Sequence, residues 1–343
     1  MTFRVRFYKI KNIRETLRER DEYSMKNNHE QVKRYCGRLE QVFGIKELIR
    51  SDGRAAGTKE LHVSTGGGLE FVLNASRCLD ITSLRFAGRN IGFLAKPGVN
   101  TVPGAFHESA PLGMLTTCGL GTCGKGSDSQ PFHGKIGLAP AENLCLQADE
   151  NIICVSGNMH ESVLFAENFL FKRKISCVPF ENKLVIEDVI ENNTENEMPY
   201  YLLYHVNFGY PFLDEALTLQ LPQHNVRPRD KAATAGLVDY TVMKKPVDNY
   251  AEQVFFFEQV AQENGEVVIG LQNKALGIGA RLCYDPTLLP NLAMWKSLKS
   301  GDYALGLEPA NNTIQGHLRE TSSFSVPPYG QVSIKLSLEF FVL

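Results

Sequence analysis

The chain carries a histidine and a glutamate in two strand-like segments that lie far apart in the sequence. A two-residue period along residues 201–207 puts His205 and Asn207 on one face of a strand, among aromatic and apolar side chains. A later alternating run ends in Glu308. If the fold brings the histidine and the carboxylate together, they can give and take protons near neutral pH. This pair predicts acid/base chemistry on a neutral polar substrate, and a sugar fits that description best.

The neighbours of these residues sharpen the hypothesis. Glu308 stands between a leucine and a proline, so we expect partial desolvation to raise its pKa and make it a better base near pH 7. A capping or surface glutamate is the alternative. His133 is a further candidate, because the glycine after it lets a ligand approach the backbone closely. Taken alone it would more often be structural, and only its combination with His205 and Glu308 favours a binding role.

Composition limits the class of protein. With 343 residues, 43% of them hydrophobic, the chain can bury a sizeable core. The formal net charge of -2 gives no field for phosphate backbones or anionic lipid, so neither nucleic acid nor membrane is an expected partner. No apolar run approaches the roughly 20 residues of a membrane span, and the N-terminus lacks a secretory signal, which predicts a cytoplasmic location. The 8 dispersed cysteines favour free thiols in a reducing compartment.

The pattern along the chain predicts an all-β fold. Partly alternating runs are typical of long antiparallel sheets that pack as a sandwich. Residues 87–140 are irregular and rich in glycine and proline, which indicates a functional loop. We expect one β domain over 36–343, preceded by an extension over 1–35 with one or two short helices. The predicted strands lie at residues 68–73, 152–156, 169–177, 183–190, 254–260, 266–271, 280–284 and 332–342.

Two features leave alternatives. Cys118, Cys123 and His133 invite a zinc interpretation, but their spacing is not that of a paired-cysteine site and a fourth ligand is not evident. We therefore expect no metal, and since no dinucleotide or phosphate-loop motif occurs, no organic cofactor. Trp295 is the only tryptophan of the chain, and it could stack on a sugar or fill the core.

Several short motifs, taken in order, resemble the aldose 1-epimerase-related proteins of the galactose mutarotase-like superfamily, most closely a poorly characterised bacterial branch. The resemblance covers roughly residues 36–343, and the ordered set is more specific than any single motif. The motifs stand at residues 77–81, 116–120, 133–134, 204–207 and 308–309.

The resemblance implies a large antiparallel β-supersandwich whose concave face binds a monosaccharide. By motif position, Glu308 matches the base that takes the proton of the anomeric hydroxyl. His205 matches the acid that protonates the ring oxygen, and His133 matches the second histidine that holds the sugar. Ring opening, rotation and reclosure then give the other anomer.

The remaining substrate-binding positions are less well defined by the resemblance. Arg77 matches the substrate-binding arginine, with Arg89 as a rival, because this chain departs from the Gly-Arg-x-x-Asn-Arg pattern of the galactose enzymes. Asp80 and Asp285 are both candidates for the orienting aspartate. Asn207, next to His205 on its strand face, is a further substrate-binding candidate.

The expected function is thus the interconversion of monosaccharide anomers. One alternative is a non-catalytic carbohydrate-binding or sensing protein of the same fold, because a fold does not determine a function. Another is a sugar epimerase that acts at a different carbon and would draw on the Cys118, Cys123 and His133 group. The sugar, its charge and a homodimeric state stay open.

Overall fold

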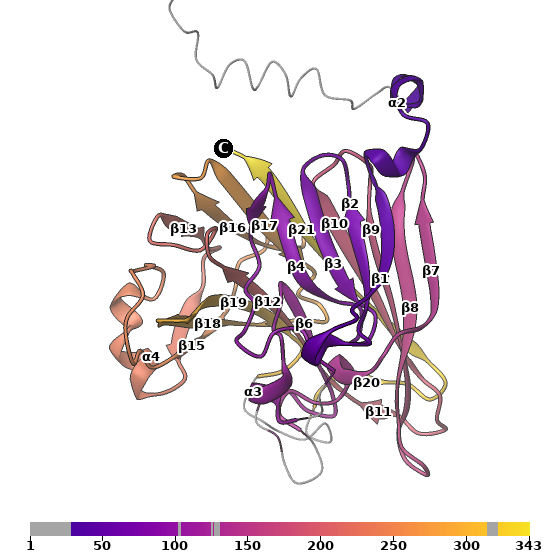
Figure 1. Cartoon of the computed structure of the whole chain (residues 1–343). Helices are drawn as coiled ribbons and strands as arrows, with labels where there is room; N and C mark the ends of the chain where they lie inside the picture. The colour runs from indigo at the N-terminus through magenta and orange to yellow at the C-terminus, as the bar shows by residue number, and fades with distance from the viewer. Residues whose placement is uncertain (1–28, 102–103, 125, 127–130, 314–321) are drawn as a thin grey trace, which may run out of the picture.

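The computed structural model describes residues 29–101, 104–124, 126, 131–313 and 322–343 (Figure 1). Most of the predicted N-terminal extension lies outside the described residues, and helix α2 (His29–Tyr35) forms at its end. None of the helices in the described ranges is long and apolar enough to cross a membrane. The other short helices are η2 (Leu39–Gln41), η3 (Gly53–Ala55), α3 (Phe106–Ser109), η4 (Ile136–Leu138), α4 (Lys231–Ala235) and η5 (Leu237–Asp239).

The prediction of an all-β fold built from antiparallel sheets is confirmed. A five-stranded sheet has the order β1 (Gly44–Ile49), β2 (Lys59–Ser64), β3 (Leu69–Asn74), β4 (Asp80–Phe86), β5 (Arg89–Asn90). An eight-stranded sheet has the order β13 (Leu217–Gln220), β16 (Val267–Asn273), β17 (Ile278–Tyr284), β21 (Gln331–Val342), β10 (Lys183–Asn192), β9 (Asn168–Cys177), β8 (Ile153–Ser162), β7 (Glu142–Ala148). A six-stranded sheet has the order β14 (Asn225–Pro228), β15 (Gln253–Glu258), β18 (Asn291–Lys299), β19 (Asp302–Ala310), β12 (Tyr201–Gly209), β6 (Leu115–Leu120), and β11 (Met198–Pro199) pairs with β20 (Ser325–Val326).

The sheets pack around one shared hydrophobic core. In Figure 1 the five-stranded sheet lies in front of β8, β9 and β10, and strands β18 and β19 run across the view. Strands β9 and β10 alternate buried and partly exposed residues, so one face packs on the core. Strands β6 and β12 are buried at every position, which indicates that both of their faces are covered.

All eight predicted strands are present, seven of them with small differences at their ends, whereas the strand predicted at 152–156 is β8, which continues to Ser162. The irregular stretch over 87–140 also contains β6, which the sequence analysis did not predict. Its sequence, Leu-Thr-Thr-Cys-Gly-Leu, has no polar and apolar alternation because every residue in it is buried. A strand covered on both faces therefore gives no two-residue signal.

A buried ionic network joins the three large sheets. Arg173 of β9 donates from Nε and Nη2 to both carboxylate oxygens of Asp188 on β10, over 2.9 and 2.7 Å. Its Nη1 donates over 2.9 Å to Asp80 of β4. Tyr204 of β12 donates its hydroxyl hydrogen to Asp188 over 2.7 Å. Thr117 of β6 donates its hydroxyl hydrogen and its backbone N–H to Asp80 over 2.6 and 3.0 Å. The network therefore holds β6 and β12 against the other two sheets.

Removing the arginine should destabilise the fold strongly. In Arg173→Met two buried carboxylates lose their cationic partner, so we expect the free energy of unfolding to fall by about 3–5 kcal/mol. Urea denaturation measures the loss. The matched control is Lys174→Met, because the next residue of β9 makes only a surface ion pair with Glu187 and should change stability by less than about 1 kcal/mol. Equal losses in the two variants would contradict this account of the network.

Candidate active site

His205 and Glu308 face each other from neighbouring strands. The register of β12 and β19 pairs Val206 with Leu307 and Leu203 with Ala310, which places His205 opposite Glu308. The histidine Nε2 lies 3.1 Å from the glutamate Oε1, and both side chains are almost fully buried. Two segments distant in sequence thus bring an imidazole and a carboxylate into contact.

A hydrogen-bond chain determines which histidine nitrogen faces the glutamate. The side-chain amide of Asn207 donates from Nδ2 to the carbonyl oxygens of Leu112 and His205, each over 2.9 Å. Its Oδ1 is therefore left to accept, and Nδ1–H of His205 donates to it. With Nδ1 carrying a hydrogen, Nε2 is the nitrogen that can exchange a proton with a ligand or with Glu308. Asn207 is fully buried and does not line the cleft, so it positions His205 instead of reaching a ligand.

The environment of Glu308 makes it a stronger base than an exposed glutamate. Burial is the largest effect and raises the pKa of Glu308, and the nearby carboxylate of Glu252 raises it further. His205 and Arg229 act in the opposite direction without cancelling the effect of burial. The direction agrees with the desolvation that its apolar sequence neighbours predict.

His133 is held as a neutral hydrogen-bond donor. The backbone N–H of Gly124 donates to Nδ1 of His133 over 3.1 Å, so the ring hydrogen sits on Nε2. Burial, followed by His205 and His107, lowers the pKa of His133 well below its ordinary value. Its ring centroid lies 5.7 Å from that of His205. In this neutral form, Nε2–H of His133 is a hydrogen-bond donor near His205.

The residue after His133 is a glycine for a reason that the sequence analysis did not identify. His133 has a φ of 64° and Gly134 a φ of 77°, both in the left-handed region. A Cβ on Gly134 would lie 2.0 Å from the carbonyl oxygen of Gly119. The glycine therefore allows the loop to pack against β6, where Gly119 N–H donates to the His133 carbonyl over 3.0 Å.

His205 lines a cleft of about 480 Å³. Trp295 forms one wall, with its ring centroid 5.5 Å from that of His205. Its indole N–H donates over 2.8 Å to Glu252, which also accepts from Arg229 over 3.0 Å. The other lining residues are Phe106, His107, Leu112, Gly124, Phe132, His133, Val254 and Glu308. The cleft thus contains an aromatic wall beside charged hydrogen-bonding groups.

Sequence reasoning did not identify Glu252 and Arg229. Glu252 precedes β15 by one residue, and Arg229 follows β14 by one residue. Both stand at strand ends without a recognisable motif. The only sequence signal was the predicted strand at 254–260, whose start is a position where a polar side chain can reach a cleft.

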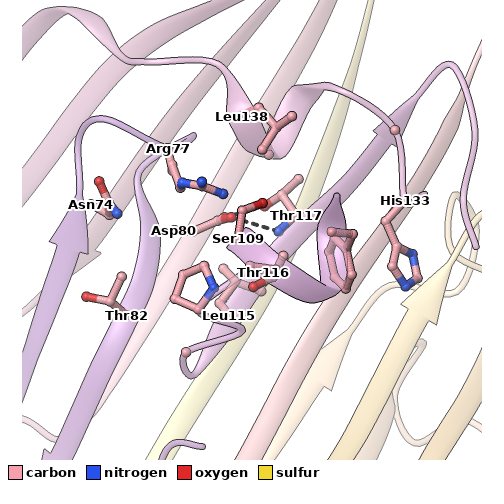
Figure 2. A pocket seen from close by; sticks show the side chains of 16 residues that line it. Asn74, Arg77, Asp80, Thr82, Ser109, Leu115, Thr116, Thr117, His133 and Leu138 are labelled. Atoms are coloured by element: carbon pink, nitrogen blue, oxygen red, sulfur yellow. Dashed lines mark hydrogen bonds between the residues drawn. The ribbon is translucent and has the colours of Figure 1, made fainter. Parts of the chain in front are cut away.

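Arg77 and Asp80 lie outside the cleft. They line a smaller pocket of about 30 Å³ that is separated from the cleft by Phe106 and His133, which contribute to both spaces. Figure 2 shows Arg77, Asp80 and Thr117 gathered in this pocket with His133 at its edge. The carboxylate of Asp80 is engaged by Arg173 and Thr117, and burial raises its pKa to about 6. The structure thus places Asp80 in the scaffold network.

Arg89 and Asp285, the alternative candidates for the substrate-binding arginine and the orienting aspartate, also lie outside the cleft. Arg89 is exposed on the edge strand β5. Asp285 is exposed in the turn after β17, where it accepts from the backbone N–H of Thr287 over 2.8 Å. Neither lines the cleft. Of the predicted site residues, the cleft therefore brings together Glu308, His205, His133 and Trp295.

Comparison with known proteins identifies the fold. A family profile described as "Domain of unknown function (DUF4432)" matches residues 55–338.

A crystal structure from Klebsiella pneumoniae, described as a "putative aldose 1-epimerase", has 24% identity and a TM-score of 0.78 over 88% of this chain and 86% of that one. A galactose mutarotase-like protein from Clostridium acetobutylicum has 15% identity and a TM-score of 0.65 over 88% and 100%. The galactose 1-epimerase of Lactobacillus acidophilus has 11% identity and a TM-score of 0.56 over 88% and 99%. No functionally curated protein matches the chain. The predicted galactose mutarotase-like fold is confirmed.

The charges around Glu308 predict opposite effects of two substitutions. Glu252→Gln removes a negative charge that raises the pKa of Glu308, so that pKa should fall. Arg229→Gln removes a positive charge that lowers it, so the pKa should rise. Titration of the Glu308 side-chain carboxyl by ¹³C NMR measures both shifts. Glu70→Gln, at an exposed position of β3, is the control and should leave that pKa in place. Shifts of the same sign in the two cleft variants would refute the assignment of these charges.

Proposed function

The chain belongs to the family described as Domain of unknown function (DUF4432), and we propose that it is an isomerase that interconverts the anomers of a monosaccharide by acid/base ring opening. One observation carries the proposal. His205 Nε2 and Glu308 Oε1 lie 3.1 Å apart at the cleft, with Asn207 fixing the orientation of the imidazole. At this distance a protonated imidazole and a carboxylate form a charge-assisted hydrogen bond.

The proposed reaction balances with these two groups alone. The Glu308 carboxylate takes the proton of the anomeric hydroxyl, and the electron pair forms the carbonyl bond as the bond from C1 to the ring oxygen breaks. That oxygen takes the Nε2 proton of the His205 imidazolium, which becomes the neutral Nδ1–H form. After rotation about C1–C2, the reverse transfers close the ring as the other anomer and restore both residues.

The other cleft residues bind and orient the sugar in this proposal. Nε2–H of His133 donates to a sugar oxygen, because its Nδ1 is already occupied. Trp295 offers an aromatic surface, and Glu252 and Arg229 offer an acceptor and a donor for hydroxyl groups. The proposed partner is a monosaccharide or a modified sugar. A cytoplasmic location and a homodimer stay predictions from the sequence.

The alternatives are less well supported by the geometry. A binding protein has no need for the Asn207 bonds that select one nitrogen of His205 for proton exchange. Epimerisation at another carbon would draw on Cys118, Cys123 and His133; the histidine lines the cleft, but both cysteines pack in a buried apolar cluster and do not. The anomeric reaction needs neither cysteine.

Substitution of the pair tests the proposal directly. Glu308→Gln and His205→Asn should each reduce the enzyme-accelerated exchange of anomers by about 10²–10⁴-fold, because each removes one proton-transfer group. Exchange NMR across pentoses, hexoses, deoxy sugars and uronates measures the rate. Glu70→Gln and His160→Asn alter exposed residues of the same types and should keep full activity. Acceleration of no sugar by the wild type, or full activity in the two cleft variants, would refute the proposal.

Gly306 gives a steric test of the same pair. A Cβ at this position would lie 3.0 Å from Glu308 Oε1 and 3.0 Å from His205 Cε1, so both side chains would have to shift. Gly306→Ala should therefore lower kcat by about ten- to a hundredfold, since small misplacements of reacting groups are costly. Gly37→Ala is the control, because its Cβ would meet nothing within 4 Å. Unchanged kcat in Gly306→Ala would show that the observed spacing is not the reactive one.

A further inference from the structure

The cleft continues into a second space on the same face of the sheet. This second hollow has a volume of about 440 Å³ and shares Phe106, Glu252 and Trp295 with the cleft. Binding sites of roughly 300–1,000 Å³ commonly accommodate drug-sized ligands, and a single hexose is smaller than those. The combined space therefore exceeds what one sugar ring can fill.

The second hollow follows the same two strands that carry the proton-transfer pair. Asp302 stands six positions before Glu308 on β19, which corresponds to roughly 20 Å along a strand. Between Glu308 and Asp302 this face of β19 carries only Gly306 and Ala304, which are buried and line neither hollow. The two hollows meet instead at Phe106, Glu252 and Trp295. Glu308, Gly306, Ala304 and Asp302 of β19 pair with Ala293, Trp295, Ser297 and Lys299 of β18.

The far end of the hollow carries the chemistry that recognises hydroxyl groups. Lys96 Nζ lies 2.6 Å from Asp302 Oδ2, and Lys299 Nζ lies 3.8 Å from the same oxygen. Two ammonium groups and one carboxylate provide both donors and an acceptor. Phe93 and Tyr250 add aromatic surface, with the Phe93 ring centroid 6.1 Å from that of Trp295. Aromatic faces beside charged hydrogen-bonding groups fit a second sugar ring.

We propose that the second hollow is a subsite for the second sugar unit of a reducing saccharide, so that the preferred substrates are reducing disaccharides or longer. The inference rests on the proposed function, which places the anomeric carbon between His205 and Glu308. Only the reducing unit has a free anomeric hydroxyl, so the unit linked to it extends past Trp295 toward Lys96 and Lys299.

Matched sugar pairs test the subsite. Each disaccharide is compared with the monosaccharide of its reducing end: cellobiose, maltose and lactose with glucose, and xylobiose with xylose. For at least one pair the wild type should show a kcat/KM about tenfold higher for the disaccharide, because binding energy from the second unit contributes to the transition state. Ser297→Phe fills the hollow and Lys299→Ala removes a donor, so both should bring that ratio near one. Lys335→Ala, an exposed lysine of β21, should keep the wild-type ratio.

The outcomes separate the two proposals. Anomer exchange with monosaccharides, but with no advantage for any disaccharide, would overturn the subsite and leave the proposed function standing. A disaccharide advantage that survives in both Ser297→Phe and Lys299→Ala would also overturn it. If no sugar is turned over, the proposed function fails. The subsite is then tested by calorimetric affinity of the wild type for the disaccharides, which Ser297→Phe should weaken about tenfold relative to Lys335→Ala. Thermal melting confirms that each variant is folded.

Discussion

The position of the candidate site depends on the buried guanidinium of Arg173. It engages carboxylates from two sheets, and the third sheet joins through Tyr204 and Thr117. A buried charge is costly unless its hydrogen-bonding capacity is satisfied, and Nη1 also donates to the carbonyl of Cys78 over 2.9 Å. This requirement fixes the sheets relative to one another more specifically than apolar packing alone. Misplacement of the five-stranded sheet would leave the Asp80 carboxylate without its cation, and misplacement of the six-stranded sheet would remove the hydrogen bonds of Tyr204 and Thr117 to the two carboxylates.

The same network positions His205 through its neighbour in sequence. Tyr204 and His205 are consecutive residues of β12, so their side chains point to opposite faces of the strand. Tyr204 bonds to Asp188 in the interior, and His205 faces the cleft. On the cleft side, one backbone N–H makes His133 a neutral donor, and one buried amide directs Nε2 of His205 toward Glu308. Scaffold hydrogen bonds thus assign different protonation roles to two histidines in one cleft.

Much of this arrangement could be predicted from the sequence because strand periodicity reports which side chains share a face. His205 and Asn207 do share a face, and Glu308 is desolvated as its neighbours indicate. The sequence could not show that the ends of β14 and β15 meet at the cleft, so Glu252 and Arg229 were not identified. The sequence also could not show whether Asp80 belongs to the scaffold or to the binding site. That distinction depends on Arg173, which is distant in the sequence and belongs to no motif.

The motifs that resemble the galactose mutarotase-like proteins therefore serve two physical purposes. His133, His205 and Glu308 line the cleft, whereas Asp80 and Thr117 hold the sheets together. The groups that would distinguish one sugar from another stand outside the motifs, at Arg229, Glu252, Trp295, Lys96 and Lys299. These residues stand at strand ends, on a loop and along β18, outside the buried Arg173 network, and of them Glu252 and Arg229 also influence the pKa of Glu308.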